Sequence, residues 1–549
     1  MSIASTDLSK NSAWLKTQSP LTFIIIRGGT SGLAVANRLS EDPTVKVLVL
    51  ESGKNYLGDP RSNMLAGWPA LFGTEADWNF VTTPQESLDG KVMGISQGQT
   101  LGGFSAINSS VFMIPSQDWK ILAPYFRKFH TLTTPLEAME CLGLQNNHSA
   151  NIPSSGPIQA SFPVAPKFEF PKLWNETFKN LGYGFSGDVS DGTAFGPYSN
   201  PASVDPNSGQ RSYTARAYYE PQSGLSFLMR ETIKTLRAFK GVILAFSISI
   251  GYLCCIENPN IKENLKDHII SGISFGVNDG VGTIDILPKE TPKALSKAMT
   301  EYMTSQSGPF GRAAVMSTSF VPVDDFQTKE DRDELENLLK AYPSPASDLH
   351  HHKFVRSLLR GSEQGNGIIF MYAAQGNLGA YFPKGLIVAD MPENFVTISA
   401  LLLNPLSIGY VHISSVNHVD ASEIDFNYLS NPLDLEVLAR HLRFVDKLAK
   451  TEPHYSLLKP NAKRNKLYTR SNDLDEVKKY VKKTGMSDWH LVGTCSMLPE
   501  NKGGGGGNLR VLDASIMPIV PRSNTQTVVY AVAERAADII KGTSWSEHL

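Results

Sequence analysis

The stretch Thr22-Phe-Ile-Ile-Ile-Arg-Gly-Gly-Thr-Ser-Gly-Leu33 decides the fold prediction for this chain. An apolar, β-branched run meets a glycine-rich turn, and a helix-like segment with apolar residues through Leu39 follows. A continuous apolar strand is typical of a parallel sheet that is buried on both faces. Strand, glycine turn and helix in this order predict the start of a dinucleotide-binding βαβ unit.

The spacing of the glycines assigns an expected role to each position of the turn. Gly29 lets the backbone approach a pyrophosphate, and Gly32 lets the helix pack closely on the strand. Arg27 stands where the pattern G-x-G-x-x-G has its first glycine, and a side chain in an unfavourable φ region costs roughly 1–2 kcal/mol. A second apolar strand ends at Glu51, where an acidic residue typically accepts hydrogen bonds from ribose hydroxyls. The alternative is a βαβ unit that binds no nucleotide.

Length and composition indicate a globular protein with two or more domains. The chain has 549 residues, of which 41% are hydrophobic and 19% are charged. Its net charge of −2 gives no electrostatic argument for nucleic-acid binding. The first twenty residues lack the features of a signal peptide, and the apolar run 241–256 is shorter than the roughly 20 residues that span a bilayer. We therefore expect no nucleic-acid partner, no membrane span and an intracellular, cytoplasmic location.

Five further motifs, in order along the chain, resemble landmarks of the glucose–methanol–choline (GMC) family of flavoprotein oxidoreductases. They are "GQTLGGFSAINSSVFM" (98–113), "VDPNSGQRSYTARAYYEP" (204–221), "IENPNIKENLKDH" (256–268), "DWHLVGTCSM" (488–497) and the segment 508–540. The resemblance covers the chain from about residue 23 to residue 540 and is nearest to fungal members, including those of secondary metabolism. It implies an α/β fold, in which a Rossmann-like FAD-binding domain is joined to an α+β substrate domain built on an antiparallel sheet.

The resemblance also implies a domain division, which composition and periodicity do not show. The expected segments are the FAD-binding domain in 1–150, 201–265 and 481–549, and the substrate domain in 151–200 and 266–480.

Two residues match the catalytic positions of the family. His490 matches the histidine that takes the proton of a substrate hydroxyl while hydride leaves for flavin N5, a role that suits imidazole. Asn524 matches a position that is His or Asn in the family, where an amide can donate to the substrate oxygen but cannot act as a base. The alternative readings are a structural histidine and an asparagine that caps the following helix.

The positions assigned to FAD lie in five parts of the chain. They are Gly28, Gly29, Thr30, Ser31, Gly32, Glu51, Leu101, Gly102, Gly103, Ser105, Asn108, Asp513, Ala514, Asn524 and Thr525. No metal is expected, and the run of histidines at 350–352 is interpreted as a solvated loop.

Several departures from the family pattern concern the segments that hold the flavin. Besides Arg27, a helix near residue 254 is missing, the region 116–126 is short, and five glycines at 503–507 replace a longer segment. Two explanations stay open, namely an imperfect gene product and a fold kept for a task that depends less on flavin.

The predicted function is the FAD-dependent oxidation of a hydroxyl group on a small organic molecule, with oxygen or an unidentified compound as electron acceptor. Two other classes stay open. One is a non-redox cyclase or dehydratase of secondary metabolism on the same fold. The other is a catalytically impaired remnant.

Overall fold

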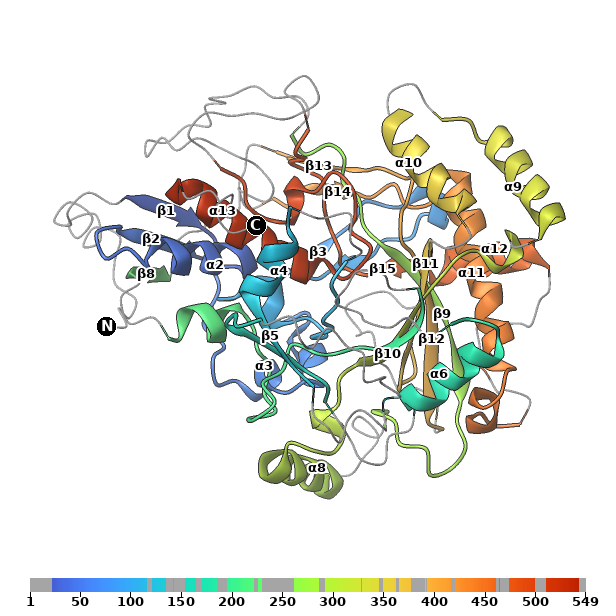
Figure 1. Ribbon diagram of the computed structural model, residues 1–549, viewed down its shortest axis with the longest axis horizontal. Helices are drawn as coiled ribbons and strands as arrows, with labels where there is room; N and C mark the ends of the chain where they lie inside the picture. Colours follow the sequence, from blue (N-terminus) through green and yellow to red (C-terminus); the bar gives the residue numbers. More distant parts are fainter. Residues whose placement is uncertain are drawn as a thin grey trace.

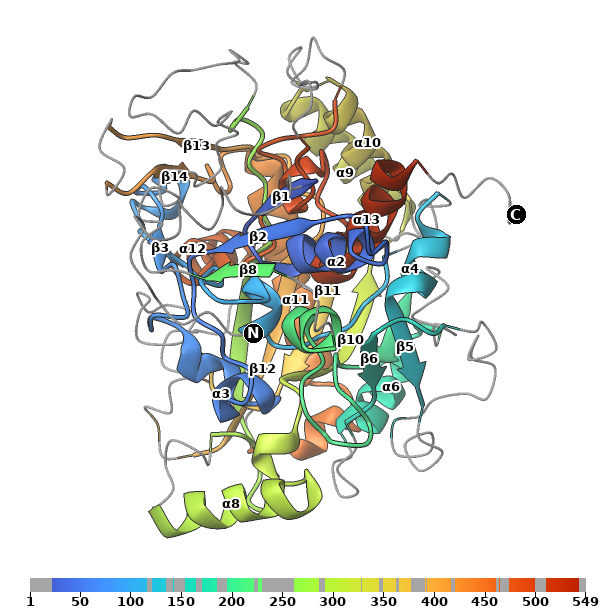
Figure 2. The same ribbon diagram turned by 90° about the vertical axis from the view of Figure 1, so that its left-hand side faces the viewer.

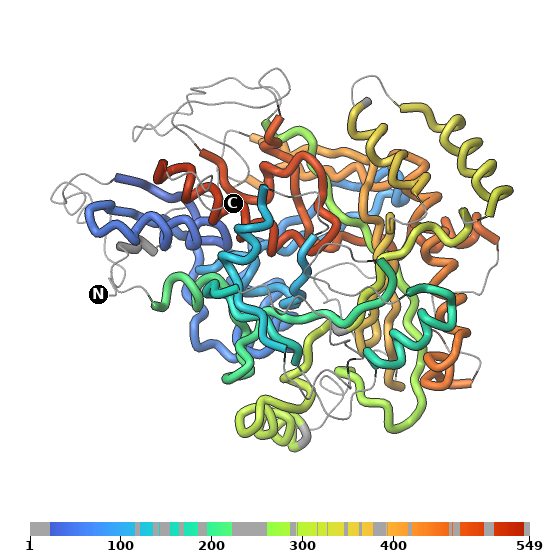
Figure 3. The backbone as a smooth tube through the Cα atoms, viewed as in Figure 1, coloured from blue at the N-terminus to red at the C-terminus, as the bar shows by residue number. Residues whose placement is uncertain are grey.

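A computed structural model gives the arrangement of the chain (Figure 1). The structure describes residues 22–115, 121–134, 142, 154–163, 170–184, 195–221, 226–229, 261–285, 292–326, 328–344, 349–361, 365–376, 391, 393–415, 420–460, 464, 473–498 and 510–542. Segments from the two ends of the chain lie side by side, as the blue and red parts of Figure 3 show. There, helix α13 (Thr525–Lys541) packs on helix α2 (Thr30–Leu39).

A small parallel sheet carries the predicted βαβ unit. Its strands are β1 (Phe23–Ile26), β2 (Val47–Glu51) and β8 (Ser226–Met229), in the order β1-β2-β8. Phe23 pairs with Val47 in parallel register, and α2 connects the two strands. Figure 2 shows this sheet beside α2 and α13. The strand–turn–helix–strand order predicted from the sequence is confirmed.

The expected burial of the first strand on both faces is wrong. The exposed fractions of Ile24 and Ile26 are 59% and 36%, whereas the side chains of β2 are almost fully buried. Phe23 and Ile25, on the other face of β1, pack against the buried cluster that contains α2, so only one face of this strand is covered. An apolar run alone does not distinguish an edge strand from a central one.

Arg27 occupies the turn between β1 and α2 in a left-handed conformation, with φ of 78°. Its amide donates to the carbonyl of Leu50 at 2.7 Å, and its guanidinium lies 5.8 Å from the centre of the Trp78 ring. A Cβ on Gly32 would lie 2.1 Å from the Arg27 carbonyl oxygen, so this helix–strand contact requires glycine at position 32. The turn thus keeps its tight geometry with arginine in place of the first glycine.

A second, antiparallel sheet forms the other half of the molecule. Its six strands, in spatial order, are β15 (Met486–Ser487), β9 (Ile269–Gly276), β12 (Phe395–Leu402), β11 (Gly367–Tyr372), β10 (Val315–Val321) and β7 (Gly196–Ser199). Every neighbouring pair is antiparallel. The α/β fold with an antiparallel second sheet is therefore confirmed, whereas the five-segment domain division stays a prediction.

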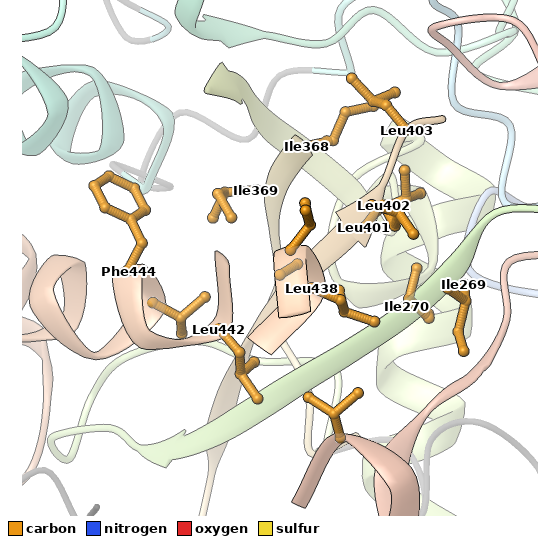
Figure 4. Packing of buried hydrophobic residues seen from close by; sticks show 14 of the residues in the cluster. Ile269, Ile270, Ile368, Ile369, Leu401, Leu402, Leu403, Leu438, Leu442 and Phe444 are labelled. Atoms are coloured by element: carbon orange, nitrogen blue, oxygen red, sulfur yellow. The ribbon is translucent and has the colours of Figure 1, made fainter. Parts of the chain in front are cut away.

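Helix α11 (Pro432–Ala449) covers one face of this sheet. Leu438 and Leu442 lie four residues apart on one face of the helix, in the same buried cluster as Ile369 and Leu402 of the sheet (Figure 4). All four side chains are at most 3% exposed, and burying each stabilises the fold by about 1.5–3 kcal/mol. This core holds the central strands β9 and β12 in place.

The remaining elements connect or flank the two sheets. The helices are α3 (Pro60–Asn63), α4 (Ala123–Phe129), α6 (Phe170–Asn180), α8 (Pro292–Ser305), α9 (Lys329–Ala341), α10 (Leu349–Arg360) and α12 (Leu474–Thr484). The strands are β3 (Phe80–Val81), β4 (Gly94–Ile95), β5 (His130–Thr133), β6 (Ile158–Ser161), β13 (Tyr410–His412) and β14 (Glu423–Asp425). Short helical turns include η3 (Gly103–Ala106) and η12 (Ala514–Ile516). No helix among the described residues is long and apolar enough to cross a membrane.

The interpretation of residues 350–352 as a solvated loop is wrong. They lie in α10, and the exposed fractions of His351 and His352 are 8% and 2%. The helix has a buried apolar side that includes Val355 and Leu359, and this side carries the two histidines inward. The predicted loss of a helix near residue 254, the apolar run 241–256 and the five glycines at 503–507 lie outside the described residues.

The left-handed φ of Arg27 predicts an unusual order of stability for two substitutions. Alanine keeps the steric cost of a positive φ and glycine removes it, so Arg27→Gly should be more stable than Arg27→Ala by about 1 kcal/mol. Both variants lose the contact with Trp78, so the difference isolates the backbone strain. Urea unfolding of the two proteins measures it.

The matched control is Ser40, whose φ is −81°. There the order should reverse, with Ser40→Ala more stable than Ser40→Gly. Equal stability of the two Arg27 variants would contradict the assignment of strain to this turn.

Candidate active site

The glycine turn of the βαβ unit is tied to the end of the second strand. The Gly28 amide donates to Oε2 of Glu51 at 2.8 Å, and the Gly53 amide donates to Oε1 at 2.7 Å. Glu51 is 5% exposed, and this burial raises the pKa of its carboxyl group. A carboxylate oxygen can accept more than one hydrogen bond, so these contacts leave room for a ribose hydroxyl at Glu51. The ribose contact itself stays a prediction.

Two glycine segments that are far apart in the sequence meet at the start of α2. The Gly102 amide donates to the carbonyl of Gly28 at 2.7 Å, and Thr30 Oγ1 donates to the carbonyl of Gly102 at 3.3 Å. A Cβ on Gly103 would lie 2.9 Å from the Cα of Gly29, and Gly102 has a φ of 91°. Thr30 and Ser31 form the first turn of α2, whose amides are free to face an anion. This close, side-chain-free surface fits the pyrophosphate of a dinucleotide.

The segment after these glycines runs from the turn towards a cavity. Leu101 is fully buried, and Ser105 is 1% exposed with its hydroxyl donating to the Gly102 carbonyl at 2.6 Å. Ser105 therefore braces the loop from within. Asn108, in contrast, lies on the cavity wall, and its Oδ1 accepts from Nη1 of the fully buried Arg211 at 2.8 Å.

The cavity has a volume of about 80 Å³ and lies between the glycine segment and the antiparallel sheet. Aromatic side chains make up much of its wall, namely Trp68, Phe72, Phe104, Phe370, Tyr372 and Trp489. The polar groups on the wall include His490, Asn524, Asp488 and Thr525. Of the sequence-predicted residues, the structure thus brings Asn108, His490, Asn524 and Thr525 to one cavity.

His490 and Asn524 contact each other directly. Nδ2 of Asn524 lies 3.0 Å from Nε2 of His490. Asn524 occupies the N-cap position of α13, but its side chain makes no capping hydrogen bond, so the interpretation as a capping side chain is wrong. His490 is 6% exposed, and burial, followed by the neighbouring His268, lowers the pKa of its imidazole well below 6.5.

The two remaining sequence-predicted positions lie at η12. Asp513 occupies the N-cap position of this turn, where its Oδ1 accepts from the Ser515 amide at 2.9 Å. Asp513 is exposed and Ala514 half-buried. Neither lines the cavity, so their contact with FAD stays a prediction.

Sequence reasoning missed three residues that support His490. Oδ1 of Asp267 accepts from the His490 amide at 2.6 Å, Nδ1 of His268 lies 2.9 Å from Nδ1 of His490, and Oδ2 of Asp488 lies 3.2 Å from the same atom. Burial raises the pKa of Asp267 to about 6, against the hydrogen bonds that it accepts. Burial, followed by Asp267, raises the pKa of Asp488 well above its usual range. The signal was present, because Asp267 and His268 end one of the motifs that carried the resemblance.

Comparison with known proteins gives a family match and relatives that cover almost the whole chain. Residues 405–533 match the family model described as GMC oxidoreductase. The chain is 27% identical to dehydrogenase citC of Monascus ruber, over 95% of this chain and 96% of the relative. It is 25% identical to pyranose dehydrogenase 3 of Leucoagaricus meleagris, over 94% and 92%.

Solved structures share the fold. An FAD-dependent oxidoreductase from Chaetomium thermophilum matches with a TM-score of 0.77 and 22% identity, over 95% of this chain and 99% of that chain. A fungal aryl-alcohol oxidase matches with a TM-score of 0.73 and 20% identity, over 95% and 99%. The chain therefore carries a GMC oxidoreductase domain in residues 405–533 and is similar over almost its whole length to fungal dehydrogenases.

Proposed function

We propose that this protein oxidises the hydroxyl group of a small organic molecule to a carbonyl group, with His490 as the base. The observation that carries the proposal is the pair formed by Nε2 of His490 and Nδ2 of Asn524, 3.0 Å apart on the wall of one cavity. A base and an amide donor side by side are what a substrate hydroxyl needs for deprotonation and orientation.

Two residues of the chain have separate roles in the proposed reaction. His490 takes the hydroxyl proton at Nε2, and Asn524 donates to the substrate oxygen and orients it. The aromatic wall excludes water from the reacting carbon. FAD, when bound, supplies the acceptor for the hydride that leaves the same carbon.

The residues that would hold FAD are those of the two glycine segments. Gly28, Gly29 and Gly32 would approach the pyrophosphate with Thr30 and Ser31, and Gly102 and Gly103 would let backbone pass close by. The close contact of the two backbones supports this assignment, because a Cβ on Gly103 would lie 2.9 Å from the Cα of Gly29 and would push the segments apart. Asn108 and Thr525 extend the same surface to the cavity.

The wall of the cavity favours an apolar, aromatic alcohol as substrate. A sugar presents several hydroxyls, and each one buried without a partner costs about 1–3 kcal/mol. Trp68, Phe72 and Phe370 offer ring faces in place of such partners.

Substitution of the base tests the central proposal. His490→Ala should lower kcat by about 10²–10⁴-fold, because no other wall residue replaces a positioned general base. FAD should still bind, so the purified variant should keep the flavin absorbance of the parent protein. Anaerobic mixing with substrate should bleach the parent and leave the variant yellow.

The matched control is His412→Ala, because His412 is a partly exposed surface residue paired with Glu263. This variant should keep the parent activity. Product mass separates the alternatives, since oxidation removes two hydrogens, whereas a ring closure or dehydration leaves the oxidation state unchanged. A parent protein that neither binds FAD by calorimetry nor gains thermal stability from it would overturn the proposal.

The pH dependence follows from the lowered pKa of His490. The base works in its neutral form, which is present above its pKa in the folded protein and is lost as the pH falls through that pKa. Burial places this pKa well below 6.5. A profile of kcat/KM should therefore be flat from pH 7.5 through 6.5 and decline only at lower pH, and a decline centred near 6.5 would contradict the buried, neutral base.

Substrate choice tests the interpretation of the wall. We expect kcat/KM for benzyl alcohol to exceed that for glucose by about 100-fold or more, which corresponds to roughly 3 kcal/mol. Cyclohexylmethanol serves as the matched apolar control without an aromatic ring. Glucose turned over as well as benzyl alcohol would exclude an apolar substrate site.

A further inference from the structure

His268 lies directly behind the base, and the sheet fixes its position. It immediately precedes β9, whose residues Ile269 and Ile270 pair with Ser487 and Met486 of β15. The short strand β15 leads to His490, so the strand pairing places the two imidazoles opposite each other. Their Nδ1 atoms are 2.9 Å apart and their ring planes are 85° apart. His268 itself is fully buried.

The second nitrogen of His268 has a partner that settles where its proton lies. Nε2 of His268 lies 3.0 Å from the carbonyl oxygen of Leu403, the residue after β12. A carbonyl oxygen only accepts hydrogen bonds, so Nε2 of His268 carries the hydrogen. Burial lowers the pKa of His268 to about 3, which keeps its ring neutral. Nδ1 of His268 then carries no hydrogen and can only accept a hydrogen bond.

A bare Nδ1 on His268 determines the tautomer of its neighbour. Two lone pairs at 2.9 Å would repel, so Nδ1 of His490 must carry the hydrogen that it donates to His268. Nε2 of His490 is then the unprotonated atom, and it is this atom that contacts Asn524 at the cavity.

Asp488 cannot make this choice, although its Oδ2 lies 3.2 Å from Nδ1 of His490. As a carboxylate it only accepts hydrogen bonds, but as a neutral acid it can donate as well as accept, and it is then compatible with either tautomer of His490. The other nearby carboxylate, Asp267, contacts the His490 backbone amide and the Ser487 and Tyr428 hydroxyls. Of these neighbours, only His268 accepts in every protonation state that the site allows.

We propose that His268 is a positioning residue that holds His490 in the tautomer with hydrogen on Nδ1, and so presents a bare Nε2 to the substrate hydroxyl. The chain of contacts runs from the Leu403 carbonyl through His268 to His490. This inference rests on the proposed role of His490 as the base.

Two amide substitutions at position 268 separate the two hydrogen bonds. Asparagine places its Oδ1 near the position of Nδ1, so His268→Asn keeps an acceptor for His490 and loses the donor to Leu403. Glutamine places its amide nitrogen near the position of Nε2, so His268→Gln keeps the donor to Leu403 and loses the acceptor for His490.

The first readout is the tautomer itself, from ¹⁵N NMR of the FAD-loaded protein labelled at histidine, with His490→Ala used for assignment. The parent and His268→Asn should show hydrogen on Nδ1 of His490, and His268→Gln should show a population with hydrogen on Nε2. The parent should also show hydrogen on Nε2 of His268. This readout does not depend on turnover, so it tests the inference even if no alcohol is oxidised.

The second readout is kinetic. His268→Gln should lower kcat about tenfold with little change in KM, the effect of one lost hydrogen bond, whereas His268→Asn should stay within a few-fold of the parent. His268→Asn should be less thermally stable than His268→Gln, because His268→Asn leaves the Leu403 carbonyl without its donor. Hydrogen on Nδ1 of His268, an unchanged His490 tautomer in His268→Gln, or equal losses of kcat in both variants would overturn the proposal. Loss of all turnover in the parent, with the expected tautomers present, would instead refute only the proposed oxidation.

Discussion

The buried carboxylate of Asp267 is the contact on which the candidate active site depends. It accepts from the His490 backbone amide at 2.6 Å and from the Tyr428 hydroxyl at 2.5 Å, and the Ser487 hydroxyl also donates to it. Asp267 precedes β9, Ser487 is the last residue of β15, and His490 follows β15. One side chain thus joins the antiparallel sheet to the segment that carries His490. Its removal would leave three buried donors without an acceptor, at a cost of about 1–3 kcal/mol for each donor.

The wall of the cavity comes from two parts of the molecule whose local geometry is set by different interactions. The glycine segments belong to a parallel βαβ unit in which close backbone approach, not side chains, shapes the surface. His490 belongs to the edge of an antiparallel sheet whose register follows from strand pairing. The segment from Gly102 to Asn108 spans the two, because it starts against Gly28 and ends on the cavity wall.

How much the sequence predicts depends on the distance between interacting residues along the chain. The βαβ unit was predictable because strand, turn and helix are encoded within about thirty contiguous residues. The exposure of Ile24 and the burial of His352 could not be predicted from the sequence, because each depends on which distant element covers the side chain. His268 and His490 are 222 positions apart, so no spacing rule connects them, and the same holds for Asn108 and Arg211.

The unused capping position of Asn524 has an electrostatic consequence. Because its side chain turns to His490, it satisfies none of the amide groups at the start of α13. The macrodipole of this 17-residue helix therefore ends, with its partial positive charge, at the cavity wall formed by Asn524, Thr525 and Gln526. In the proposed oxidation, a substrate oxygen that loses its proton there would acquire negative charge beside this helix end. The field of α13 would then favour the alkoxide over the neutral alcohol, independently of any side chain that transfers the proton.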